Sequence, residues 1–155
     1  MAIHPPLVLA LCLDGVDDEA LVRAAKPWFA RFERIEVWCG YGDAAARELA
    51  HLRERHGRPP APPPPPHRER DDPDREAAEA IAQKGVALLR SEGSEATSRI
   101  FGGADPGHAL AEASTPDVAL FLSSGHRSGI GPKSIGHVAR FIVDHAGGPV
   151  ILVKL

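Results

Sequence analysis

The sequence predicts an α/β fold, namely a doubly wound, five-stranded parallel sheet with helices on both faces. Short apolar runs without polar alternation recur along the chain, as expected for strands that are buried on both faces. Segments with helical spacing of apolar residues separate these runs, and glycine-containing turns follow several of them. Strands that alternate with helices in this way form parallel sheets.

The length and charge of the chain limit the classes of protein to which it can belong. Its 155 residues fit a single domain, residues 1–155, and a net charge of −3 gives no basic excess for nucleic acid or an acidic membrane. No apolar run approaches the ~20 residues of a membrane-spanning helix. We therefore expect a cytoplasmic protein without nucleic-acid or membrane partners, in which Cys12 and Cys39 are buried, reduced thiols.

The N-terminal elements are a strand and a helix. Residues 7–13 form a continuous apolar run that ends at Asp14-Gly15, which predicts a central strand. Acidic residues 17–19 favour a helix start, because negative charge stabilises the first helical turn. Pro27 interrupts the helical pattern and is expected to kink this helix or divide it in two.

The second strand precedes a region of unusual composition. Residues 35–39 predict a strand that closes at residues 40–42, and residues 43–56 have a helical pattern. Residues 57–73 then hold a proline-rich segment that is expected to be a loop or an insertion. It is either a proline-rich ligand for a protein partner or a tolerated surface insertion, and we favour the insertion.

The second half of the chain continues the alternation of helices and strands. The first predicted element is a helix over 74–90 that ends at Gly93, and its inward-facing residues are Ala77, Ile81, Leu88 and Leu89. A strand over 96–101 follows and leads into Gly102-Gly103. Asp105 then caps a helix that runs from Pro106 to about Ser114. The last are a strand over 117–122, a helix with Ile135, Val138, Ala139 and Ile142 on one side, and a strand over 150–153.

A ligand site is expected where the strands end. In doubly wound sheets, ligands bind beyond the carboxyl ends of the strands, near the point where strand order reverses. The relevant strand ends are Asp14-Gly15, Cys39-Gly40, Gly102-Gly103 and residues 123–126.

The loop after the fourth strand has the composition of an anion site. Gly125, Gly129, Gly131 and Gly136 would let backbone N–H groups face an anion, and the following helix start adds partial positive charge. Arg127 and Lys133 could add charge, and neighbouring serines could donate to phosphate oxygens. The alternative is a loop in which the glycines only close turns.

Several segments carry a resemblance to a known family. They are residues 117–129, 135–146 and 149–153, together with Asp14-Gly15 after the first strand and the turn at 103–106. In this order and spacing they resemble the universal stress protein family, over nearly the whole chain apart from about residues 43–73. The resemblance implies an adenine nucleotide alpha hydrolase-like fold with strand order 3-2-1-4-5. It also implies a non-enzymatic role in stress response as a homodimer.

The resemblance implies site residues for ATP or another adenine nucleotide. Asp14 and Gly15 would face the nucleoside, Gly40 would border the base, and the phosphate side would comprise Ser123, Gly125, His126, Arg127, Gly129, Gly136 and His137. Nucleotide-binding members carry Gly, two residues, Gly, nine residues, then Gly and Ser or Thr. With Gly136 as the last glycine, Ser123 and His126 replace the first two and His137 replaces the hydroxyl residue.

The remaining expectations concern chemistry and partners. No catalytic residue and no metal ligand are predicted, although His126 and His137 could alternatively form a metal or phosphate clamp. The C-terminal strand, residues 150–155, could pair with a second copy because no helix follows it. Two alternative functions stay open: an ATP-binding switch with weak or incidental hydrolysis, and a protein-interaction module that uses the proline-rich loop.

Overall fold

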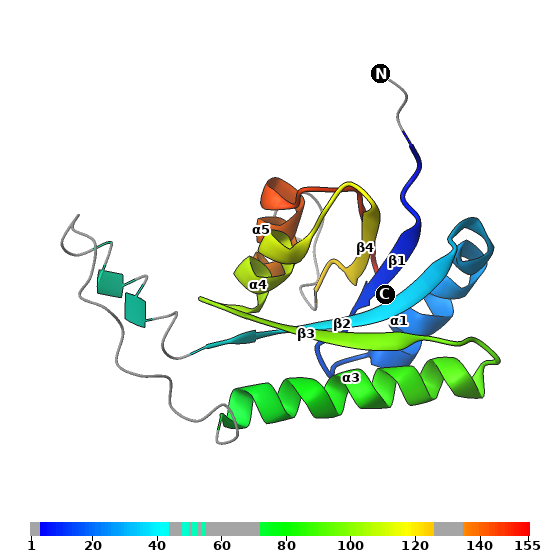
Figure 1. Cartoon of the computed structure of the whole chain (residues 1–155), viewed down its shortest axis with the longest axis horizontal. Coiled ribbons are helices and arrows are strands. Elements are labelled where there is room, and N and C mark those ends of the chain that lie inside the picture. Colours follow the sequence, from blue (N-terminus) through cyan, green and yellow to red (C-terminus); the bar gives the residue numbers. More distant parts are fainter. Residues whose placement is uncertain (1–3, 44–47, 50, 53, 55–71, 126–134) are drawn as a thin grey trace.

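The architecture of the chain is a five-stranded sheet covered by helices. A computed structural model describes residues 4–43, 48–49, 51–52, 54, 72–125 and 135–155. Its sheet has the order β3-β2-β1-β4-β5, and all four strand pairs are parallel. Figure 1 labels the first four strands of the chain, β1 to β4. The predicted fold class and the strand order implied by the resemblance are therefore confirmed.

The strands place the central β1 between β2 and β4. Their bounds are β1 Val8–Cys12, β2 Arg34–Gly42, β3 Thr97–Gly103, β4 Val118–Ser123 and β5 Val150–Val153. In register, Leu11 of β1 lies beside Val37 on one side and Phe121 on the other. Strand order reverses between β1 and β4, and this reversal creates the crevice where doubly wound sheets bind ligands.

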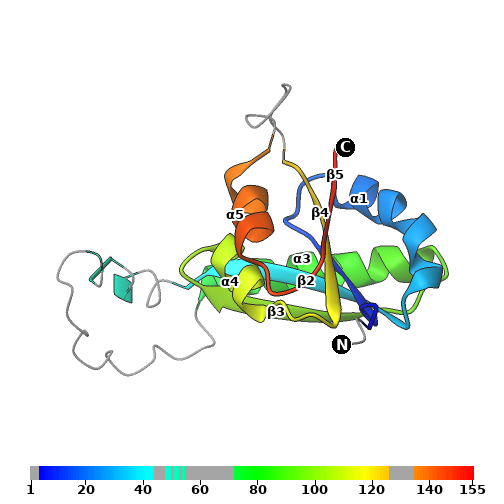
Figure 2. The ribbon, with the colours of Figure 1, turned by 90° about the horizontal axis from the view of Figure 1, so that it is seen from above.

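Helices cover both faces of the sheet (Figure 2). One face carries α1 (Asp18–Ala25), the 3₁₀ helix η1 (Lys26–Arg31) and α3 (Pro73–Ser91), and the other carries α4 (Pro106–Ala113) and α5 (His137–His145). Pro27 divides the first helix as predicted, because α1 ends at Ala25 and continues only as η1. Gly93, with a φ of +83°, follows the end of α3.

Two apolar layers form the core, one on each face of the sheet. Leu9, Leu11 and Leu13 pack toward α1 and α3, whereas Val8, Ala10 and Cys12 pack toward α4 and α5. This alternation follows from the period of a strand, and both sets are buried because both faces are covered. Cys12 and Cys39 are buried free thiols, as the sequence predicted.

The two tryptophans belong to different layers. Trp28 of η1 packs edge-on against Phe121, with ring centroids 6.4 Å apart. Trp38 of β2 is buried on the opposite face and packs against Phe101, with ring centroids 4.6 Å apart. Each tryptophan therefore belongs to one apolar layer of the core.

The predicted ends of two strands were wrong. Residues 40–42 and Gly102-Gly103 were expected to form turns, but they continue β2 and β3. The reason is the close approach of α4: a Cβ on Gly40 would lie 2.6 Å from the Pro106 carbonyl oxygen, and one on Gly103 would lie 3.0 Å from the Ala109 Cα. These glycines therefore allow a helix to pack closely on the strands.

Some predicted inward-facing residues were also wrong. In α3, Ala77 is exposed, Leu89 is buried as predicted, and Ile81 and Leu88 are partly buried against the core. The buried face also includes Ala78, Ala82, Gly85 and Val86. Val138 is 48% exposed, and Ile135 precedes α5 instead of lying in it. Ala139 and Ile142 of α5 are buried as predicted.

Parts of two predictions lie outside the described residues. Within the predicted helix at 43–56, residues 48, 49, 51, 52 and 54 are helical, and positions 44–47, 50, 53, 55 and 56 are outside the description. Residues 57–71 of the proline-rich segment are also outside it. Among the described residues, no helix combines the length and apolar character needed to span a membrane.

Candidate functional site

A cavity of about 500 Å³ lies beyond the carboxyl ends of β1, β2 and β4. Six residues predicted for the site line it: Asp14, Gly40, Ser123, Gly125, Gly136 and His137. Most other lining side chains are apolar, including Ile81 of α3, Leu110 of α4 and Ile142 of α5. Three of the four predicted strand ends, those of β1, β2 and β4, therefore share one cavity, whereas Gly102-Gly103 of β3 does not line it.

The turn between β1 and α1 is fixed by the side chain of Asp18. Its carboxylate accepts hydrogen bonds from the backbone amides of Asp14, at 3.3 Å, and Gly15, at 3.2 and 3.1 Å. One oxygen of the Asp14 carboxylate accepts from the Val16 amide at 2.8 Å. Gly15 itself has a φ of +85°, which a side chain would strain. The Asp14 carboxylate therefore has a defined place at the cavity.

The role of Asp18 in this turn was not predicted. The acidic run 17–19 indicates a helix start, because negative charge stabilises the first helical turn. A carboxylate three residues after a glycine turn can also accept from the amides of that turn, and this spacing could have identified Asp18.

The opposite wall of the cavity joins the end of β4 to the start of α5. Gly125 has a φ of +96°, and a Cβ there would lie 3.2 Å from both the Cα and the N of Gly136. The Gly136 amide donates to the Ser124 carbonyl at 2.7 Å. The two glycines therefore bring two backbone segments into contact beside the N-terminus of α5, which favours anions.

Three predicted site residues lie outside the described part of the chain. They are His126, Arg127 and Gly129, in the segment 126–134. The predicted clamp of His126 and His137 falls partly in this segment, and His137 is an exposed residue at the cavity wall. Within the described residues, no three His, Cys, Asp or Glu side chains are arranged to hold a metal ion.

Burial controls the acid–base behaviour of this region. Burial raises the pKa of the Asp18 carboxyl, while hydrogen bonds from the Asp14 and Gly15 amides and the charge of Lys84 act in the opposite direction. Burial also raises the pKa of Cys12 to about 12 and that of Cys39 to about 11, and the charges of Asp18 and Asp14 contribute at Cys39. Both cysteines line the cavity as neutral thiols.

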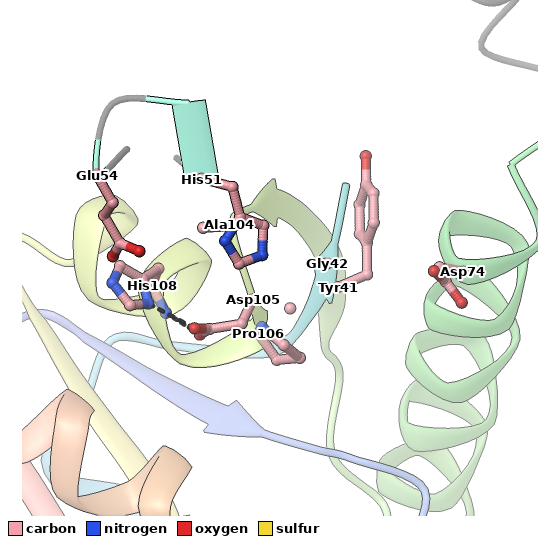
Figure 3. A pocket seen from close by; sticks show the side chains of 10 residues that line it. Tyr41, Gly42, His51, Glu54, Asp74, Ala104, Asp105, Pro106 and His108 are labelled. Atoms are coloured by element: carbon pink, nitrogen blue, oxygen red, sulfur yellow. Dashed lines mark hydrogen bonds and ion pairs between the residues drawn. The ribbon is translucent and has the colours of Figure 1, made fainter. Parts of the chain in front are cut away.

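A second cavity, of about 600 Å³, adjoins the first and shares Gly40 and Pro106 with it. Figure 3 shows the side chains that line it, which include Tyr41, His51, Glu54, Asp74, Asp105 and His108. The sequence analysis did not predict this cavity, because its residues come from four separate elements. Only the tertiary structure brings them together.

This arrangement suits a ligand with hydroxyl donors at one end and an anionic group at the other. Asp14 offers a carboxylate oxygen to donors at the β1 end of the first cavity. The helix start at Gly136 and His137 offers backbone dipoles to an anion at the far end. Apolar side chains between them suit a flat, weakly polar group.

Comparison with known proteins identifies the fold. No protein-family model and no curated protein sequence matches the chain. A universal stress protein from Archaeoglobus fulgidus is similar in structure, with 21% identity, coverage of 98% of this chain and 100% of that one, and a TM-score of 0.62. A universal stress protein in complex with cAMP has 16% identity and a TM-score of 0.62, and the match covers 97% of this chain and 99% of that one. The universal stress protein of Archaeoglobus fulgidus in complex with dAMP has 18% identity and a TM-score of 0.54, and the match covers 99% of this chain and 100% of that one. The chain therefore has the universal stress protein fold.

Proposed function

We propose that this chain is a non-enzymatic, cytoplasmic stress-response protein that acts as a homodimer and binds an adenine nucleotide. The observation that carries the proposal is the cavity of about 500 Å³ in which Asp14 and the N-terminus of α5 face one ligand space. The two structural neighbours with cAMP and dAMP support an adenine nucleotide in this fold.

The chemistry of the cavity supports the following proposed arrangement of the nucleotide. Its ribose hydroxyls donate to Asp14, its base lies against Gly40 and the apolar wall, and its phosphate lies at Gly125, Gly136 and His137. Among the residues outside the description, His126, Arg127 and Gly129 belong to the phosphate side in this proposal.

We expect a nucleoside monophosphate to bind at least as well as ATP. A triphosphate binds where glycines let the backbone approach its oxygens closely. This protein has Ser123 and His126 at two of the three glycine positions of the motif that nucleotide-binding family members carry. His137 stands in place of a hydroxyl donor to phosphate. A single phosphate beside the α5 N-terminus requires fewer of these contacts.

Calorimetric titration with AMP, cAMP and Mg-ATP tests the nucleotide site. Micromolar binding of AMP or cAMP is the expected result, and Asp14→Ala should weaken it by about tenfold because a charged acceptor is lost. Glu19→Ala is a suitable control, since Glu19 is exposed on α1, the helix that follows this turn, and pairs with Arg23. The absence of heat at millimolar nucleotide would contradict the proposed site. Sustained phosphate release from ATP would instead favour the hydrolytic switch.

The dimer is proposed to form through Val150–Leu155. β5 is an edge strand of the sheet, and its four residues are only half-buried. Unpaired backbone groups on such an edge favour pairing with another strand. Leu155 is 51% exposed beyond the strand and would add apolar area to the contact.

A further inference from the structure

Asp18 differs from the other acidic residues near the cavity in its burial. It is the first residue of α1, yet only 9% of it is exposed, while Glu19 beside it is exposed. A carboxylate is rarely buried unless its oxygens are satisfied by donors. The donors here are the backbone amides of Asp14 and Gly15.

These hydrogen bonds hold the backbone that carries Asp14. Both oxygens of the Asp18 carboxylate accept from Gly15, and one of them also accepts from the amide of Asp14 itself. The first oxygen of Asp14 is occupied by the Val16 amide, whereas its second oxygen accepts no hydrogen bond from the described residues and is the one we assign to a ligand. The orientation of that oxygen therefore depends on a turn that Asp18 fixes from behind.

We propose that Asp18 is a positioning residue, which holds the β1–α1 turn so that the free oxygen of Asp14 meets a hydroxyl donor of the ligand. The proposal rests on the proposed function of the cavity as a nucleotide site. It assigns to Asp18 no contact with the ligand, because Asp14, and not Asp18, lines the cavity. The ligand class it concerns is one with ribose hydroxyls at the Asp14 end.

The titratable and charged groups near Asp18 determine how pH should affect the β1–α1 turn. They are Asp14 at the end of β1, Cys39 on β2 and Lys84 on α3. Burial raises the pKa of Asp18, so mild acid protonates it before ordinary exposed carboxylates. A protonated carboxyl offers a donor where the turn needs an acceptor. Ligand affinity should therefore decrease on acidification through the titration of Asp18.

Two substitutions at this position separate its roles. Asp18→Ala removes every acceptor, whereas Asp18→Asn keeps one oxygen acceptor of similar shape but does not titrate. Glu19→Ala on the same helical turn is the matched control, because its partner is the exposed Arg23. Thermal unfolding and circular dichroism first establish that each variant is folded.

The first measurement is amide hydrogen exchange on the ligand-free protein. Asp18→Ala should accelerate exchange of the Gly15 amide by about tenfold or more relative to the unaltered protein, because its acceptor is lost. Glu19→Ala should leave this rate unchanged. An unchanged Gly15 rate in Asp18→Ala would overturn the proposal.

The second measurement is the dissociation constant of AMP as a function of pH. We expect Asp18→Ala to raise it by about tenfold at neutral pH, and Asp18→Asn to raise it by less. The ratio of the constants of the unaltered protein and Asp18→Asn cancels the titration of AMP itself. This ratio should rise on acidification, and a ratio independent of pH would contradict the role of the Asp18 carboxylate.

The two measurements distinguish the two proposals. If the unaltered protein binds no AMP, cAMP or ATP, the proposed function fails, and the exchange rate of Gly15 still decides whether Asp18 holds the turn. If AMP binds and Asp18→Ala binds it equally well, the nucleotide site stands and the positioning role of Asp18 is wrong.

Discussion

The carboxylate of Asp105 makes two contacts with one residue, His108. Its Oδ1 accepts a hydrogen bond from the His108 amide at 2.9 Å, and its Oδ2 lies 2.7 Å from Nδ1 of the His108 ring. The first contact caps α4, and the second holds the ring at the second cavity. The cap that the sequence predicted therefore also orients a side chain that it did not predict.

The capping role of Asp105 gives the first prediction. Asp105→Ala should lower the free energy of unfolding by about 1 kcal/mol, because the N-cap acceptor of α4 is lost. Asp105→Asn should retain most of the stability, since asparagine caps helices equally well. Urea denaturation of the three proteins measures the difference. Equal loss in both variants would show that the contact with the ring, and not the cap, stabilises α4.

Two glycines at the cavity should respond differently to alanine. Gly40→Ala should destabilise the fold by about 1–3 kcal/mol, because its Cβ would lie 2.6 Å from the backbone oxygen of Pro106. At Gly136 the nearest atom is 3.5 Å away, and its φ of −66° suits alanine. We therefore expect Gly136→Ala to fold normally and to bind AMP more weakly, as the methyl group occupies the phosphate approach. Thermal unfolding and calorimetry on both variants test this contrast.

The buried thiols predict a loss of stability in alkali. Because burial raises the pKa of Cys12 to about 12 and of Cys39 to about 11, the folded state keeps both protons after the unfolded chain has released them. Their contribution is therefore complete below about pH 9 and decreases as pH rises toward those values, by about 1.4 kcal/mol per pH unit for each thiol. The double variant Cys12→Ala, Cys39→Ala should show a shallower decrease in urea titrations between pH 9 and 10.5. If the free energy of unfolding of the double variant and of the unaltered protein decreased equally with pH, the raised pKa values of the two thiols would be contradicted.

The outer edge of β5 gives a test of the dimer. The Pro149 carbonyl accepts from Leu120 of β4, and the Val153 carbonyl accepts from Ser124, the residue after β4. By the alternation of a strand, the backbone N–H of Leu152 therefore faces away from the sheet. Leu152→Pro should therefore convert a dimer into a folded monomer in sedimentation experiments, because it removes an outward donor. Ile151→Pro, which loses a donor to β4, should instead reduce the stability of the monomer. A monomeric unaltered protein at tens of micromolar would refute the dimer.

Most of the fold could be predicted because its signals are local. The buried strands are continuous apolar runs. A proline interrupts a helix in any context, as Pro27 does here, and the pair Asp105-Pro106 is by itself a signal for a helix start. The order of the strands came from the resemblance, since no local pattern encodes it. The structural neighbours share this fold at 13–21% identity.

The errors arose where a residue serves a distant contact. Gly40 and Gly103 have the composition of turns, yet they lie in strands because α4 packs against them. In α3 the prediction was wrong at Ala77, because the alanines that meet the core are Ala78 and Ala82. Small side chains give a weak periodic signal, so the position of the face could not be fixed from the sequence.

The candidate site was predicted in part. Asp14 and Gly136 lie about 120 positions apart in the sequence, and the parallel topology places both at one cavity. Asp18 was missed because the acidic run 17–19 also fits a helix start, and the hydrogen bonds that its spacing after Gly15 permits were not considered. The second cavity was missed because it depends on how His51 and Glu54 lie against α4.

The placement of Trp28 and Trp38 on opposite sides of the sheet makes each a spectroscopic reporter of one layer. Replacing either by phenylalanine leaves a single indole, whose emission follows the α1–α3 side or the α4–α5 side separately. Coincident fluorescence transitions would then mean that the two layers melt as one cooperative unit, whereas separate transitions would reveal an intermediate with only one layer intact.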